Sequence, residues 1–148
     1  MRYRLSDLVF ACDRALPELD DNPAPPSDAP VEVDVRWHTG PRAGTAHAHF
    51  EWRTPSGGHW LTFARDGAGG FVLTFTTFAV FALSHDAARV DVHPLAGTPE
   101  PTVRHLLLNQ VLPLVLSHRG RLVLHAAAVR VGSQACAFVG RSCAGKST

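Results

Sequence analysis

Lysine is nearly absent from this sequence of 148 residues: 13 of the 14 basic side chains are arginine, and the one lysine is Lys146. Thirteen acidic side chains bring the formal net charge to +1. Proteins that bind nucleic acids usually carry a basic excess or a basic stripe, so this balance argues against such a partner. Hydrophobic residues make up 45% of the sequence and charged residues 18%, which is enough to build a buried core.

Cysteine and long apolar runs are also scarce. The three cysteines, Cys12, Cys136 and Cys143, form neither a disulfide framework nor a CxxC metal motif, which predicts a reducing compartment. No apolar segment of signal-peptide length follows the N-terminus. The longest apolar stretch, residues 71–83, contains three threonines and is shorter than the roughly 20 residues that cross a bilayer. We therefore expect a cytoplasmic protein with no membrane span.

Short segments of β-type sequence fill the first two thirds of the chain. Six of them alternate polar with apolar residues or are rich in aromatic and branched side chains: residues 31–37, 46–53, 59–65, 71–76, 78–83 and 88–93. A period of two is typical of strands with one buried face, and turn residues separate the later segments at hairpin spacing. The sequence therefore predicts an antiparallel meander of about six strands in an N-terminal β-rich domain, residues 1–95.

A helix is predicted after the loop that follows this domain. Thr102 is suited to cap it, and the apolar residues that follow continue to Leu112. Pro113 should kink the helix or start a second short one, because proline has no N–H to donate within a helix. Gly120 is a typical residue just past a helix end, so we expect the helical segment to stop there.

Two strands are predicted next, at residues 121–131 and 134–139, joined by a turn at Gly132 and Ser133. Between residues 135 and 139 the second strand shows no polar alternation. Strands of this kind are typical of the buried centre of an α/β sheet.

Directly after this strand the sequence matches G-x-x-x-x-G-K-[ST], the phosphate-binding P-loop or Walker A motif. Backbone N–H groups of such a loop form a nest for phosphate oxygens, and the Lys146 ammonium would reach the β- and γ-phosphates. The Ser147 hydroxyl would bind Mg²⁺, so the motif predicts ATP and Mg²⁺ as cofactors. The predicted nucleotide-binding residues are Gly140, Arg141, Ser142, Cys143, Ala144, Gly145, Lys146, Ser147 and Thr148.

The segments around the motif carry a family resemblance. They are Leu106-Leu107-Leu108-Asn109-Gln110-Val111-Leu112-Pro113, Gly120-Arg121-Leu122-Val123-Leu124-His125-Ala126, and the turn and strand before the Walker A loop. With the loop they resemble the HPr serine kinase/phosphorylase-like proteins, and more closely the bacterial HPr-kinase-related group. The resemblance implies an ATP-dependent kinase fold related to phosphoenolpyruvate carboxykinase, which phosphorylates serine on a protein or peptide.

The expected fold class is therefore α+β. An N-terminal antiparallel β-rich domain is followed by a helix and by the first strands and P-loop of an α/β kinase domain, residues 102–148. The sequence stops at Thr148, before the helix, further strands and acidic residue that a P-loop enzyme needs. We accordingly expect an incomplete kinase domain that does not transfer phosphate by itself. Cys143 stands where such loops usually have glycine, which should weaken nucleotide binding without abolishing it.

Two other functions stay open. A P-loop ATPase of transport type carries a similar loop, although about 100 residues of β-meander before it would be unusual. A non-catalytic β-domain could instead bind a protein partner. Trp37, Trp52 and Trp60 are expected in the core of the sheet, although any that are exposed could form a peptide-binding face. His47, His49 and Glu51 have a spacing that could hold Zn²⁺, but such a row is more often the solvated face of a strand. Self-association also stays open.

Overall fold

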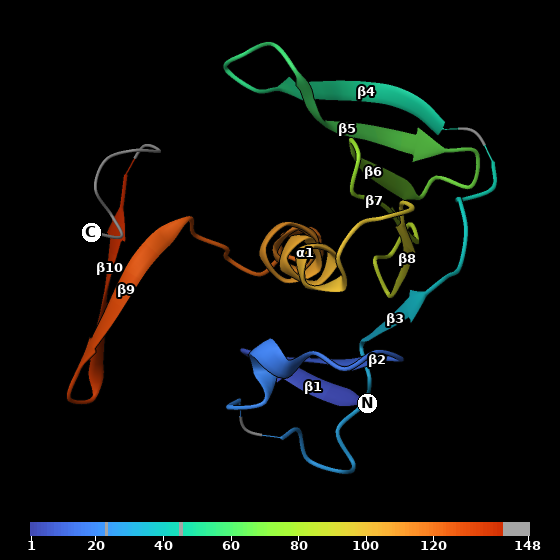
Figure 1. Ribbon diagram of the computed structural model, residues 1–148. Helices are drawn as coiled ribbons and strands as arrows, with labels where there is room; N and C mark the ends of the chain where they lie inside the picture. Colours follow the sequence, from blue (N-terminus) through green and yellow to red (C-terminus); the bar gives the residue numbers. More distant parts are fainter. Residues whose placement is uncertain (23, 45, 141–148) are drawn as a thin grey trace.

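The computed structural model describes residues 1–22, 24–44 and 46–140, and every structural statement below refers to them. The fold is α+β and consists mostly of sheet (Figure 1). Its strands are β1 (Arg2–Leu5), β2 (Leu8–Cys12), β3 (Val33–Trp37), β4 (Ala46–Arg53), β5 (His59–Asp66), β6 (Phe71–Phe75), β7 (Ala79–Leu83), β8 (Arg89–Pro94), β9 (Ala126–Val131) and β10 (Gln134–Val139). Its helical segments are a 3-10 turn at Pro17–Leu19, α1 (Glu100–Leu106), a π-helical segment at Leu107–Val111 and α2 (Leu112–His118).

Eight strands form one mixed sheet in the order β1-β2-β3-β8-β7-β6-β5-β4. All six strands predicted between residues 31 and 93 are present, and β4 to β8 form the predicted antiparallel meander. The purely antiparallel prediction is wrong for β3, which lies parallel to both β2 and β8. β3 lies inside the sheet between β2 and β8, the last strand of the meander, whereas its neighbour in sequence, β4, forms the far edge.

The core lies between one face of the sheet and the helical segment that crosses it (Figure 1). Alternate strand residues point to this face, and they are joined in the core by one side of the helix. The fully buried large side chains include Phe10, Val33, Val35, Phe75, Phe81, Val90, Val92, Val103, Leu107 and Leu112. Burying each of them removes apolar surface from water, which stabilises the folded state by roughly 1.5–3 kcal/mol for a side chain of this size. The helix therefore completes the core of the sheet that precedes it in sequence.

Pro113 shapes the middle of the helix. The helix begins at Glu100 after Pro99, so Thr102 does not cap it as predicted. Proline has no N–H to bond the carbonyl of Asn109, and the turn before it widens into the π-helical segment, in which the N–H of Leu112 bonds the carbonyl of Leu107. The helix ends as predicted before Gly120, whose φ is +77°.

The strands β9 and β10 form an antiparallel hairpin that turns at Gly132. The strand predicted at residues 121–131 begins only at Ala126, and residues 121–125 belong to no strand. The prediction of a buried β10 is wrong: all six of its side chains are exposed, including Phe138. No other strand among the described residues pairs with the hairpin, and most of its side chains are exposed.

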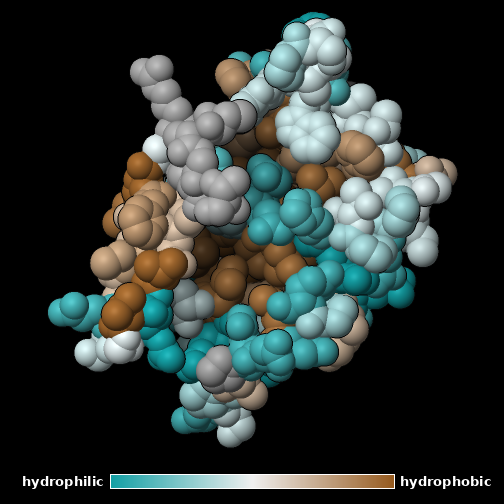
Figure 2. All heavy atoms as spheres, turned by 60° about the vertical axis from the view of Figure 1, so that its left-hand side comes forward, coloured by the Kyte–Doolittle hydropathy of each residue, from teal (hydrophilic) through white to brown (hydrophobic). Residues whose placement is uncertain are grey.

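Several large apolar side chains are consequently exposed in and before the hairpin: Leu122, Val123, Leu124, Val129, Val131, Phe138 and Val139. Figure 2 shows hydrophobic residues at the surface on this side of the molecule. Within the described ranges, no helix combines the length and apolar character needed to cross a membrane. The division into domains at residues 1–95 and 102–148 stays a prediction. The helix, which is assigned to the second domain, packs on the sheet of the first.

Candidate functional site

The predicted nucleotide site follows the end of β10. The strand runs to Val139 and Gly140 comes directly after it, so the extended segment that should lead into a Walker A loop is present. The other eight predicted nucleotide-binding residues, 141–148, lie outside the described residues; they include Lys146 and the predicted metal ligand Ser147. The described structure therefore contains the strand before the predicted nucleotide site and the first residue of the motif, Gly140.

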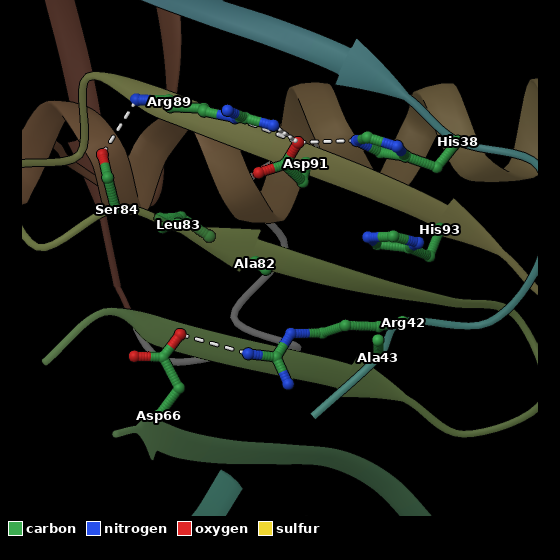
Figure 3. A pocket seen from close by; sticks show the side chains of 10 residues that line it. All are labelled: His38, Arg42, Ala43, Asp66, Ala82, Leu83, Ser84, Arg89, Asp91 and His93. Carbon is green, nitrogen blue, oxygen red and sulfur yellow. Dashed lines mark hydrogen bonds and ion pairs between the residues drawn. The ribbon is translucent and has the colours of Figure 1, made fainter. Parts of the chain in front are cut away.

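A second candidate site is a cavity of about 380 Å³ on the face of the sheet opposite the helix (Figure 3). We call it the Arg–His cavity, and it lies between the segment after β3 and the strands β5, β7 and β8. Its lining consists of His38, Arg42, Ala43, Asp66, Ala82, Leu83, Ser84, Arg89, Asp91 and His93. Most of these side chains are polar or charged, unlike those of the core on the other face.

The alternation of β8 supplies one side of the cavity. Val90 and Val92 point into the core, so Arg89, Asp91 and His93 point to the opposite face. The neighbouring strand β7 places Ala82 directly opposite Asp91 in the antiparallel register. Because alanine is small, it leaves space between the charged groups of β8 and those of the segment that crosses this face.

Asp91 holds two of the basic side chains through a single oxygen. Its Oδ1 lies 2.6 Å from Nε2 of His38, and it accepts hydrogen bonds from Nη2 and Nε of Arg89 at 2.7 and 3.1 Å. Burial raises the pKa of the Asp91 carboxyl, but the hydrogen bonds and charges of Arg89 and His38 outweigh it and keep this pKa below its usual value. Asp91 is therefore an ionised carboxylate that fixes the orientation of both partners.

The two histidines of the cavity stack on each other. The rings of His38 and His93 are nearly parallel, with their centroids 4.6 Å apart. Nδ1 of His93 lies 3.3 Å from the carbonyl oxygen of Gly40, and since a carbonyl only accepts, this nitrogen carries the proton. Burial lowers the pKa of His93, the bond to Gly40 raises it, and the neighbouring His38 lowers it further, with a net decrease. His93 is thus neutral near pH 7, with Nε2 unprotonated.

Arg42 and Asp66 form the other side of the cavity. Nη2 of Arg42 donates to Oδ2 of Asp66 at 3.1 Å, and both side chains are largely buried. Oδ1 of Asp66 accepts from the N–H groups of Ala68 and Gly70 at 3.1 and 2.9 Å, which fixes the β5–β6 turn. Gly70 lies so close to the neighbouring strand that a Cβ there would come within 2.5 Å of the carbonyl oxygen of Leu83.

No local sequence pattern predicts this cavity. His38 and Asp91 are 53 positions apart, and they meet only because β3 lies parallel to β8. The predicted row of His47, His49 and Glu51 does not share one face, because a β-bulge between Ala48 and Phe50 interrupts the alternation of β4. In the part of the chain that the structure describes, no group of three His, Cys, Asp or Glu residues is arranged to hold a metal ion.

Comparison with known proteins finds no match to this chain among protein-family models, curated proteins or solved structures. Function must therefore be inferred from the motif at the end of β10 and from the contacts of the described residues.

Proposed function

We propose that this chain supplies the ATP-binding segment of a serine kinase resembling HPr kinase. In this proposal the full-length form transfers the γ-phosphate of ATP to a serine of a protein or peptide. The observation that carries it is the complete Walker A motif, which begins at Gly140 immediately after β10. The position of the lone lysine agrees with this role, because a compact ammonium fits between phosphates where the planar guanidinium of arginine would not.

The exposed hairpin is consistent with this role. In P-loop proteins the strand before the loop is normally covered on both faces, and β10 has the uninterrupted apolar sequence of such a strand. Its exposed Phe138 and Val139 lie immediately before the loop, where the packing of a nucleotide domain would cover them. The eight-stranded sheet before the motif favours the kinase over a transport ATPase, whose ATP-binding subunits do not normally carry such a segment.

Nucleotide binding is tested by titrating the chain with Mg-ATP in a calorimeter. The Lys146→Ala variant should bind at least about tenfold more weakly, because one charge-assisted contact to phosphate is lost. The matched control is Arg130→Ala, which removes a positive charge from an exposed position on β9. Equal affinities for all three chains, or an equal loss in both variants, would contradict a Walker A site.

Transfer of phosphate to serine, the kinase hypothesis, is tested separately in the full-length form. With ATP labelled at the γ-phosphate and a mixture of serine-containing peptides, label should appear on serine and should disappear with Lys146→Ala. Release of inorganic phosphate with no labelled serine would instead favour the transport ATPase.

A partner-binding role for the sheet is the second candidate. It rests on the edge strand β4, where Phe50 and Trp52 are more than half exposed. Both point to the same side of the sheet as the core, at its edge. Exposed aromatic residues are enriched where proteins bind one another. A protein partner lost on Trp52→Ser, with Mg-ATP binding unchanged, would support this role.

A further inference from the structure

The Arg–His cavity contains more free donors than free acceptors. Both oxygens of Asp66 are occupied, by two backbone N–H groups and by Arg42. Oδ1 of Asp91 is occupied by Arg89 and His38, and among the described residues none donates a hydrogen bond to its Oδ2. Ser84 is also engaged, with Asp86 and with the backbone of Arg89.

The arginines, in contrast, retain donors. Arg42 has five N–H groups and uses one on Asp66 and one on the carbonyl of Gly44, at 3.4 Å. Arg89 uses Nε and Nη2 on Asp91, and its Nη1 has no hydrogen bond to any residue that the structure describes. Figure 3 shows the two guanidinium groups on different sides of the space above Ala82, with the histidine rings at one end.

The charges of the cavity do not oppose an anion. Arg42 and Arg89 balance Asp66 and Asp91, so these four side chains carry no net negative charge. The carboxylates also hold the arginines in place, so little side-chain freedom would be lost when an anion binds. Arg42 is the better anchor, because its side chain is only 16% exposed whereas that of Arg89 is 57% exposed.

We propose that the Arg–His cavity binds a small metabolite through a phosphate or carboxylate group, with Arg42 as its main anchor. The oxyanion accepts from N–H groups of Arg42, and Arg89 adds positive charge to the same cavity from the other side of Ala82 (Figure 3). A cavity of about 380 Å³ has room for the rest of a small molecule beside the anionic group. This site is separate from the Walker A loop and does not depend on the function proposed above.

Inorganic phosphate and malonate serve as the two probes, each added to the ¹⁵N-labelled chain while the histidine ring nitrogens are followed by NMR. We expect saturable shifts at His38 and His93 and none at His47 or His105, which do not line the cavity. Arg42→Gln should weaken the affinity about tenfold or more, since it removes a charge-assisted contact to the oxyanion. Arg89→Gln should weaken it less.

The matched control is Arg36→Gln. Arg36 lies on the same face of the sheet and pairs with Asp34 at 2.7 Å, as Arg89 does with Asp91, but it does not line the cavity. Its loss should change the affinity less than about twofold, the size expected of a screened surface charge. Lys146→Ala should leave the phosphate response intact, which separates this site from the nucleotide site.

The response to the probes decides the proposal. Saturation by either one supports it, and the tighter of the two identifies the anionic group. The proposal is overturned if neither probe gives saturable shifts at His38 and His93, or if Arg36→Gln weakens binding as much as Arg42→Gln. The same spectra check that the fold is kept, because Arg42 lies outside the strands and its replacement should leave the amide shifts of strands distant from Asp66 unchanged.

Discussion

Glu32 joins the end of the helix to the sheet, and its replacement should show how strongly the two are held together. Its carboxylate accepts from Nη2 of Arg119 at 3.2 Å and from Nη2 of Arg121 at 3.0 and 3.3 Å. It also accepts from the N–H of Val9 at 3.3 Å. The three charged side chains are each about one quarter exposed, so solvent screens them only in part.

The Glu32→Gln variant keeps the shape of the side chain and removes its charge. Hydrogen bonds to charged groups contribute about 1.5–3 kcal/mol when buried, and partial exposure reduces this, so we expect a loss of about 1–2 kcal/mol in the free energy of unfolding at pH 7. Urea denaturation followed by circular dichroism measures the difference. The matched control is Glu100→Gln, which removes a carboxylate that is about half exposed and pairs with Arg104 one helical turn away; Arg104 keeps its pair with Glu18, so the cost should be about 0.5 kcal/mol or less.

The difference between wild type and Glu32→Gln should also depend on pH. Burial raises the pKa of Glu32, but the hydrogen bonds from Arg121, Val9 and Arg119 and the charge of Arg121 outweigh it, so the pKa is lower in the folded state than the ordinary 4.5. A lowered pKa stabilises the fold fully above the unfolded-state value, and this contribution is lost as pH falls through the folded-state value. The difference should therefore be constant from pH 7 to about pH 5 and shrink below pH 4.5. A loss no larger than that of Glu100→Gln, or one that persists unchanged at low pH, would refute this reasoning.

Two further changes test the packing of the sheet and the helix. Gly70→Ala should cost about 1–3 kcal/mol, because its Cβ would collide with the backbone of Leu83; Gly67→Ala, which meets no atom within 4 Å, should be nearly neutral in the same urea titration. Leu107→Ala should cost about 2–5 kcal/mol, because this fully buried residue of the π-helical segment would leave a cavity in the core. Leu108→Ala, at a partly exposed position, should cost less, and equal thermal melting points for these two variants would contradict the placement of the helix.

The strands of the meander could be predicted from sequence because each has its own local signal. Phe71, Leu73 and Phe75 on one strand and Phe81 and Leu83 on the next alternate with residues that face away from the core, and this period survives in the structure. The partner of β3 could not be predicted in this way. Its parallel pairing with β8 joins residues more than 50 positions apart, and no local pattern encodes such a contact.

Local sequence patterns also gave wrong predictions where burial or side-chain direction depends on tertiary structure. The apolar sequence of β10 predicted burial, but burial needs a covering element, and none of the described residues provides one for Phe138 or Val139. On β4, a bulge at one position was enough to separate His47 and Glu51, which strict alternation would place together. The Arg–His cavity was missed for the same reason as the pairing of β3, because it forms only where that strand meets β8.

The most direct test of the central claim is to map where Mg-ATP binds on the ¹⁵N-labelled chain by NMR. If the Walker A motif binds nucleotide, saturable shifts should appear at the amides of residues 140–148 and at the adjoining end of β10, and Lys146→Ala should raise the Mg-ATP concentration needed to saturate them about tenfold or more. Shifts confined to His38 and His93 of the Arg–His cavity, or no saturable shifts anywhere, would contradict nucleotide binding at the motif.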